Sequence, residues 1–97
     1  MVVIHYYVDR ENLVEFNRLI QQLGESRRRD GAYAWDILED VREPNHFIEY
    51  YMVESWLGHL RQHERVTNTD KLIQEEIRKL LIDGQPPTVT RFVGPRH

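Results

Sequence analysis

The chain has 97 residues, which is enough for one domain, and its 40% hydrophobic and 30% charged residues are typical of a soluble globular protein. Its 13 Lys and Arg against 16 Asp and Glu give a formal net charge of −3, which argues against nucleic-acid binding. Cysteine is absent, which excludes disulfides, thiolate nucleophiles and thiolate metal sites. No apolar run approaches the roughly 20 residues of a membrane helix, and no secretory leader is seen. We therefore expect a cytoplasmic protein.

The first part of the chain predicts a strand followed by an amphipathic helix. Residues Val2–Val8 are β-branched and aromatic, as strands prefer, and Asp9 is placed to cap a helix over residues 10–23. Gly24 is a typical residue just after a helix end. The cluster Arg27–Arg29 is then expected in a solvated loop, with an anionic ligand or a lipid headgroup as the alternative contact.

The second part predicts a hairpin, a helical region and a last strand. Alternating residues indicate strands over 33–39 and 47–53, and the short link containing Pro44 makes them antiparallel. Ser55 is placed to cap a helix, and a second helix follows with a buried stripe of Ile73, Ile77, Leu80 and Leu81. Two prolines end it, and residues 88–93 predict a short strand.

This order, β-α-β-β-α(α)-β with the second helical region split in two, predicts an α+β fold of the ferredoxin-like type over residues 1–97 as a single domain. Its four-stranded antiparallel sheet carries the helices on one face. The other face then holds one set of strand aromatics, either Tyr7, Trp35 and Tyr51 or their alternates. Because such a face would expose a large apolar patch, we expect a homodimer through the sheet face.

Two segments resemble a known superfamily, the antibiotic-biosynthesis-monooxygenase-like dimeric α+β barrel domains. They are RRRDGAYAWDILED from Arg27 and VESWLGHLRQHERVTNTD from Val53, within a resemblance that runs from Val2 to about Val93. The second segment is most similar to the soluble C-terminal domain of major-facilitator "secretion effector" transporters. The resemblance implies a cytosolic barrel dimer, either fused to a membrane transporter in its parent protein or encoded alone.

The enzymatic members of the superfamily are cofactor-free quinone-forming monooxygenases and haem-degrading proteins, and their reactions take place between the sheet and the helices. By this resemblance, His63 stands about where many relatives carry a helix histidine. The haem-degrading reading is poorly supported, because Trp56 does not clearly match the tryptophan of those members and the first strand has no asparagine. We therefore expect no cofactor.

Several residues are candidates for chemistry. His59 and His63 are one helical turn apart, but the glutamate of an HExxH zinc motif is missing, so we predict no metal. His63 could serve as a general base towards a phenolic substrate. The candidate ligand-binding residues are Trp35, Tyr51, Trp56, His59 and Arg91. The alternative for the aromatic residues is a role in the core or the dimer interface.

Two carboxylates on apolar strands, Asp36 and Glu49, must be paired or have a shifted pKa if they are buried, and Arg91 and Arg42 are the expected partners. The resemblance of the second segment, together with the lack of a complete catalytic set, favours a ligand-sensing or regulatory domain of unassigned activity. The alternative is a cofactor-independent monooxygenase acting on an aromatic polyketide-like small molecule, so enzymatic activity is left open. A third hypothesis is haem binding through His59 or His63.

Overall fold

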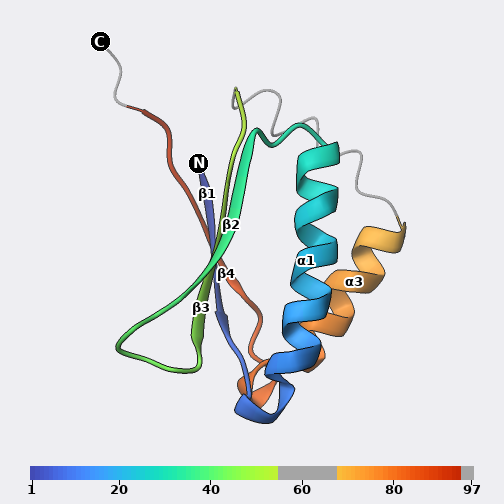
Figure 1. The fold of residues 1–97 in the computed structure, drawn as a ribbon, viewed down its shortest axis with the longest axis vertical. Helices are drawn as coiled ribbons and strands as arrows, with labels where there is room; N and C mark the ends of the chain where they lie inside the picture. Colours follow the sequence, from blue (N-terminus) through green and yellow to red (C-terminus); the bar gives the residue numbers. More distant parts are fainter. Residues whose placement is uncertain (55–67, 95–97) are drawn as a thin grey trace.

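The computed structural model describes residues 1–54 and 68–94. Along the chain, β1 (Val2–Tyr7) leads through the 3-10 turn η1 (Arg10–Asn12) into α1 (Leu13–Arg29). The strands β2 (Ala34–Glu39) and β3 (His46–Met52) then form a hairpin. The helix α3 (Asn68–Lys79), the turn η2 (Ile82–Gly84) and β4 (Thr88–Arg91) complete the described order (Figure 1).

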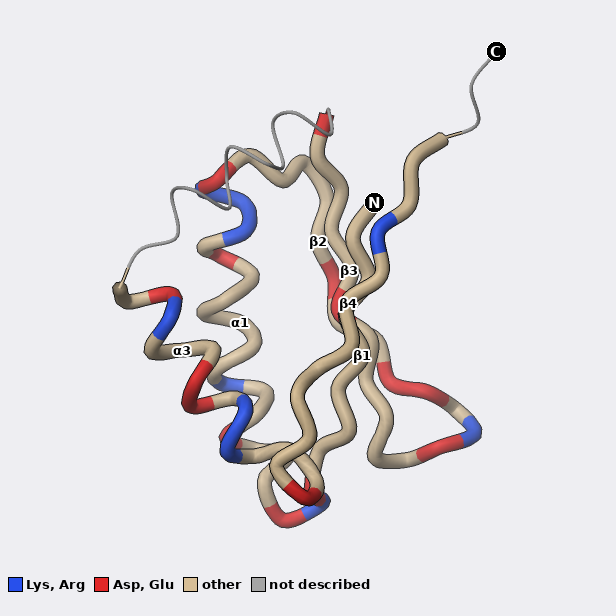
Figure 2. The backbone as a smooth tube through the Cα atoms, turned by 180° about the vertical axis from the view of Figure 1, so that it is seen from behind, with Lys and Arg blue, Asp and Glu red and all other residues tan. Residues whose placement is uncertain are grey.

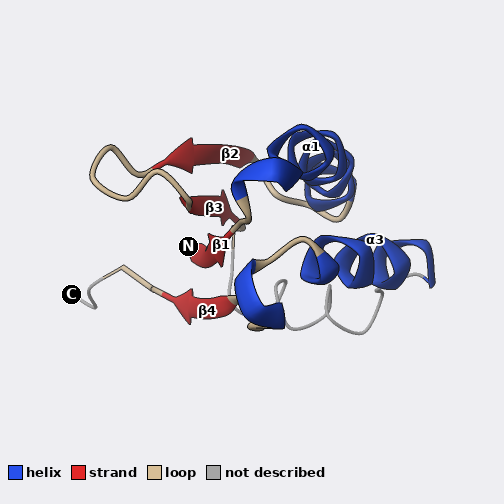
Figure 3. Ribbon diagram, turned by 90° about the horizontal axis from the view of Figure 1, so that it is seen from below, coloured by secondary structure: helices blue, strands red, loops and turns tan. Residues whose placement is uncertain are grey.

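The four strands form one antiparallel sheet in the order β2-β3-β1-β4, and α1 and α3 cover one of its faces (Figure 3). This arrangement is the predicted ferredoxin-like α+β fold. The predicted strands agree with β1, β2 and β3 to within one residue at each end. The last strand is shorter than expected and ends at Arg91. The helix expected directly after Ser55 lies outside the described residues.

The core lies between the sheet and the two helices. Phe16, Ile20 and Leu23 of α1 meet Ile77 of α3 and Val8, and all five are at most 1% exposed. Strand alternation adds Val2, Ile4 and Tyr6 from β1, and Phe47, Glu49 and Tyr51 from β3. Leu81, expected in the helical stripe, lies beyond the end of α3, where it is buried in an isolated bridge to Val8.

The first helix is longer than the sequence predicted, and this changes the environment of its arginines. The expected end at Gly24 is wrong, because α1 continues to Arg29 and buries Gly24. A Cβ atom at Gly24 would lie 2.6 Å from the Trp35 ring, so glycine here permits close packing of α1 on β2. Arg27 is therefore a helical residue facing the sheet, not part of a solvated loop.

Candidate functional site

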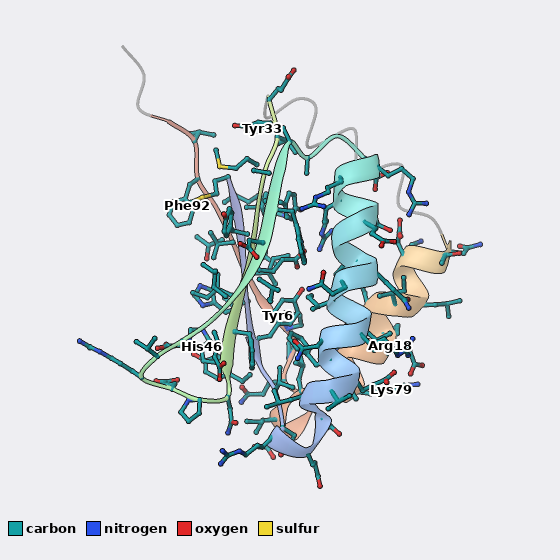
Figure 4. The ribbon with its side chains drawn as sticks, viewed as in Figure 1. Tyr6, Arg18, Tyr33, His46, Lys79 and Phe92 are labelled. Atoms are coloured by element: carbon teal, nitrogen blue, oxygen red, sulfur yellow. The ribbon has the colours of Figure 1, made fainter. Side chains whose placement is uncertain are left out.

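A buried carboxylate on β3, Glu49, organises the polar part of the space between sheet and helices. Its side chain has no solvent exposure. Tyr6 donates its hydroxyl to Oε1 at 2.8 Å, Trp35 Nε1 donates to Oε2 at 2.8 Å, and Arg27 Nε donates to Oε2 at 3.1 Å. Figure 4 shows Tyr6 between the sheet and the helices. Three elements therefore converge on one carboxylate.

Each partner reaches Glu49 because of its place in the sequence. Ile4 is the register partner of Glu49, and Tyr6 lies two residues further along the same face of β1. Trp35 is two residues from Ile37, the partner of Glu49 on β2. Arg27 continues the buried stripe of α1 by four residues from Leu23, so its stem lies on the core side of the helix. Its guanidinium also lies over the Tyr51 ring, 4.8 Å from the ring centroid.

The electrostatics of this cluster keep its tyrosines neutral and its arginine charged. Burial raises the pKa of Tyr6 well above its ordinary value, and the charge of Glu49 raises it further. Burial is the largest single influence on the pKa of Arg27 and lowers it, but the charge of Glu49, its hydrogen bond and the neighbouring Tyr51 and Tyr6 together raise this pKa above its ordinary value. Burial likewise raises the pKa of Tyr51, and the Arg27 charge only partly opposes the shift. Arg27 and Glu49 therefore form a charged pair in a largely dry environment.

The predicted carboxylate partners need correction. Glu49 is buried and paired, as expected of a carboxylate on an apolar strand, but its partner is Arg27 and not Arg91 or Arg42. The helical spacing from Leu23 to Arg27 was the available signal, and placing the helix end at Gly24 concealed it. Asp36 lies on the opposite face of the sheet and is exposed, so it does not share this environment.

Three predicted ligand-binding residues lie in one row across the sheet, on its helix-facing side. Trp35 is the register partner of Tyr51, Tyr51 is the partner of Val2, and Val2 is the partner of Arg91. Tyr51 is 5% exposed in the middle of the row, Trp35 is half-buried, and Arg91 is exposed at the β4 edge. Trp56, His59 and the predicted base His63 lie outside the described residues.

The described polar side chains of this site are engaged with one another. Both oxygens of Glu49 already accept hydrogen bonds, so this carboxylate holds Trp35 and Tyr6 in position. In the row, the Tyr51 ring is buried with the Arg27 guanidinium over it, and Trp35 is half-buried against α1. Arg91 is exposed at the β4 edge.

The fold and site together define a ferredoxin-like α+β domain with a buried polar cluster beneath its first helix. A family model described as transmembrane secretion effector matches residues 1–97, so the chain belongs to the transmembrane secretion effector family. No curated protein matches the chain. Within the described residues, neither helix has the length and apolar character that crossing a membrane requires.

Solved structures of similar fold include proteins associated with antibiotic biosynthesis. An antibiotic biosynthesis monooxygenase superposes with a TM-score of 0.77 at 19% identity over 97% of each chain. Rv0793 from Mycobacterium tuberculosis gives 0.78 at 13% identity over 99% of this chain and 94% of its own. A conserved protein from Methanosarcina mazei Go1 gives 0.76 at 21% identity over 92% and 85%. At these identities the likeness establishes the shared fold.

Proposed function

We propose that residues 1–97 act as a single, homodimeric ligand-sensing or regulatory domain whose ligand is a small aromatic compound. The observation that carries this proposal is the row of Trp35, Tyr51 and Arg91, which lies beside the buried Arg27–Glu49 pair. Recognition sites combine a largely apolar, aromatic lining with a few polar groups that are held rigidly. Here the buried pair supplies the rigidity, because it fixes the indole of Trp35 by a hydrogen bond.

In this proposal the ligand enters beside β4, where the row reaches solvent. Arg91 is exposed there and is proposed to pair with an acidic or phenolic group of the ligand. Trp56 and His59 are proposed to complete the ligand contacts. Both residues belong to the stretch of sequence between β3 and α3, which lies outside the described residues.

The proposed partner is a second copy of the chain, bound through the sheet face that α1 and α3 leave uncovered (Figure 3). Strand alternation places Val3, Ile48, Tyr50 and Met52 on that face, all half-buried, together with Leu38, which is 49% exposed. A surface of this kind is typical of an interface and unusual on a monomer. Of the aromatic residues that the sequence prediction named for this face, Tyr7 lies on it, whereas Trp35 and Tyr51 lie under the helices. Tyr50 takes the place of Tyr51 as its alternate on the uncovered face.

A link to a membrane transporter follows from the family to which the chain belongs. We propose that the domain works on the cytoplasmic side of the membrane, next to a transporter in its parent protein, and reports the presence of the exported compound. Binding of the compound to the row of Trp35, Tyr51 and Arg91 would then change the state of the domain before the transporter exports the compound. Its small size and negative charge are compatible with such an accessory role.

A second candidate is a cofactor-independent monooxygenase acting on an aromatic polyketide-like compound. It is favoured by the similarity of the fold to a solved antibiotic biosynthesis monooxygenase. In that case His63 is the proposed general base and the row holds the phenolic substrate. Oxygen uptake in the presence of a polycyclic hydroquinone measures this activity, and Arg91→Gln and His63→Ala should both reduce it.

Binding of a polycyclic aromatic carboxylate, followed by calorimetry, tests the sensing proposal. We expect saturable binding that Arg91→Gln weakens about tenfold, since a charged hydrogen bond contributes roughly 1.5–3 kcal/mol. Arg42→Gln, in the exposed β2–β3 hairpin, is the matched control and should bind like the wild type. If the wild type and Arg91→Gln bind the aromatic carboxylate equally, and the wild type takes up no oxygen, the row is not the ligand-binding site.

A further inference from the structure

A second group of polar side chains lies at the β2–β3 hairpin, away from the site described above. Asp40 follows β2, Glu43 lies in the turn, and His46 opens β3. One ligand atom from each lies within 4.8 Å of those of the other two. Figure 4 shows His46 on the side of the sheet opposite the helices, and Figure 2 shows the charged residues of the hairpin projecting from the body of the molecule.

The backbone of the hairpin holds these three residues in place. The Asp40 N–H donates to the His46 carbonyl at 2.9 Å, and the His46 N–H donates to the Glu43 carbonyl at 3.0 Å. The Arg42 N–H donates to Asp40 Oδ1 at 2.8 Å. Asp40 therefore uses one carboxylate oxygen for the turn and directs the other, Oδ2, to His46 Nδ1 at 2.8 Å. The turn uses the backbone of Glu43 and leaves its carboxylate available.

His46 is held more tightly than a hairpin histidine requires. It is 8% exposed, its ring stacks on Tyr7 with centroids 4.7 Å apart, and it is parallel to the His5 ring within 6°. His46 Nε2 lies 2.9 Å from His5 Nδ1. The two ring nitrogens of His46 thus have different partners: Nδ1 faces the carboxylates, and Nε2 faces the imidazole of His5.

The contact between His46 Nε2 and His5 Nδ1 is of the kind that a metal-bound histidine requires. A ligand histidine coordinates through one nitrogen and donates the N–H of the other to an acceptor that fixes the ring. If Nδ1 of His46 coordinates an ion, its proton resides on Nε2, and His5 Nδ1 is already placed to accept it. The same distances equally suit the opposite tautomers, in which His46 Nδ1–H donates to Asp40 Oδ2 and His5 Nδ1–H donates to His46 Nε2. Changing between these states requires proton transfer and no movement of the rings.

We propose that Asp40, Glu43 and His46 bind a divalent transition-metal ion of the zinc class, with His5 as the second-shell acceptor. One imidazole and two carboxylates match the ligands that zinc accepts, whereas magnesium and calcium prefer oxygen alone. Three protein ligands leave a coordination position for water or for a group from another molecule. The site is independent of the proposed ligand row, which lies on the other face of the sheet.

The competing explanation is that Asp40 and His46 only stabilise the turn. Glu43 separates the two explanations, because its carboxylate takes no part in the turn but is required as a ligand. Calorimetric titration of the full chain with zinc alone, compared between wild type, Glu43→Gln and Glu39→Gln, is therefore the decisive experiment. Glu39→Gln removes the same charge from the opposite face of β2, which makes it the matched control.

We expect one zinc site in the wild type that Glu43→Gln weakens at least about tenfold and Glu39→Gln leaves unchanged. His5→Phe keeps an aromatic ring but removes the acceptor, and should weaken binding about 10–100-fold, as losses of second-shell partners do. Circular dichroism confirms that each variant folds. Absence of saturable binding, or zinc binding that is identical in the wild type and Glu43→Gln, would overturn the proposal. If histidines elsewhere in the chain hold the zinc, the wild type and Glu43→Gln will bind it identically.

Discussion

Trp35 of β2 lies so close to Gly24 of α1 that a Cβ atom at position 24 would be 2.6 Å from the indole ring. Glycine in the middle of a helix lowers helix stability by about 1 kcal/mol relative to alanine. It is present here because the helix must approach the ring that donates to Glu49. The same contact explains why α1 passes Gly24 without ending.

Gly24→Ala should therefore destabilise the domain, although alanine favours helices. Overpacking a filled core costs typically about 1–3 kcal/mol, and here the rigid indole must move away from its hydrogen bond. Urea unfolding followed by circular dichroism measures the loss. Gly94→Ala is the control, because a Cβ atom there meets nothing within 4 Å and stability should not change. An unchanged or raised unfolding midpoint in Gly24→Ala would show that the helix can shift away from β2.

The pairing of Arg27 with Glu49 yields a second prediction. Arg27→Met leaves a fully buried carboxylate without its charged partner, and breaking a buried pair in this way costs about 3–5 kcal/mol. The double variant Arg27→Met/Glu49→Gln should recover most of that loss, because no unpaired charge remains. Denaturant unfolding of the two single variants and the double variant forms the cycle. Strictly additive losses would mean that the two side chains act independently. Arg18→Met, which removes an exposed ion pair on the same helix, should leave the unfolding midpoint unchanged.

The buried tyrosines predict that stability falls in alkaline solution. Burial raises the pKa values of Tyr6 and Tyr51 in the folded chain, so the unfolded chain loses these protons at lower pH. Stability from this source is complete below the ordinary tyrosine pKa, near 10, and decreases as pH rises above it. Tyrosinate absorbance should show Tyr6 ionising together with unfolding, and Tyr6→Phe should lose this part of the absorbance change. An absorbance change at the unfolding step that Tyr6→Phe leaves unaltered contradicts the prediction.

The strands and their order along the chain could be predicted from the sequence, because their alternation is regular and the β2–β3 link is short. In β1 and β3 buried side chains alternate with less buried ones, so the pattern in Val2–Val8 and Phe47–Val53 reflects the two sheet faces directly. The end of α1 could not be predicted from the sequence. Gly24 satisfies the local rule for a helix end equally well, and only the position of Trp35 shows that glycine is required for close packing.

The candidate site was predictable in part for the same reason. Trp35, Tyr51 and Arg91 were chosen as strand residues, and strand register brings them into one row. The partner of Glu49 was missed because 22 residues separate it from Arg27, and pairing at that distance depends on how α1 packs. His46 gave no signal in the sequence, since its environment comes from Asp40 across the turn and from His5 on another strand.

The open face of the sheet gives the last prediction, which concerns assembly. Leu38 lies on that face with 49% of its surface exposed, so a charge there need not disturb the fold of one copy. If two copies pack through this face, Leu38→Lys places a charge in the apolar interface on each side, and burying an unpaired charge is strongly unfavourable. Sedimentation should show a dimer for the wild type and a folded monomer for Leu38→Lys. Leu72→Lys, on α3 and 66% exposed, alters charge and apolarity equally on the helical side and should remain dimeric. A wild type that sediments as a monomer at micromolar concentration would refute the dimer itself. A dimer that Leu38→Lys leaves intact would place its interface on another surface.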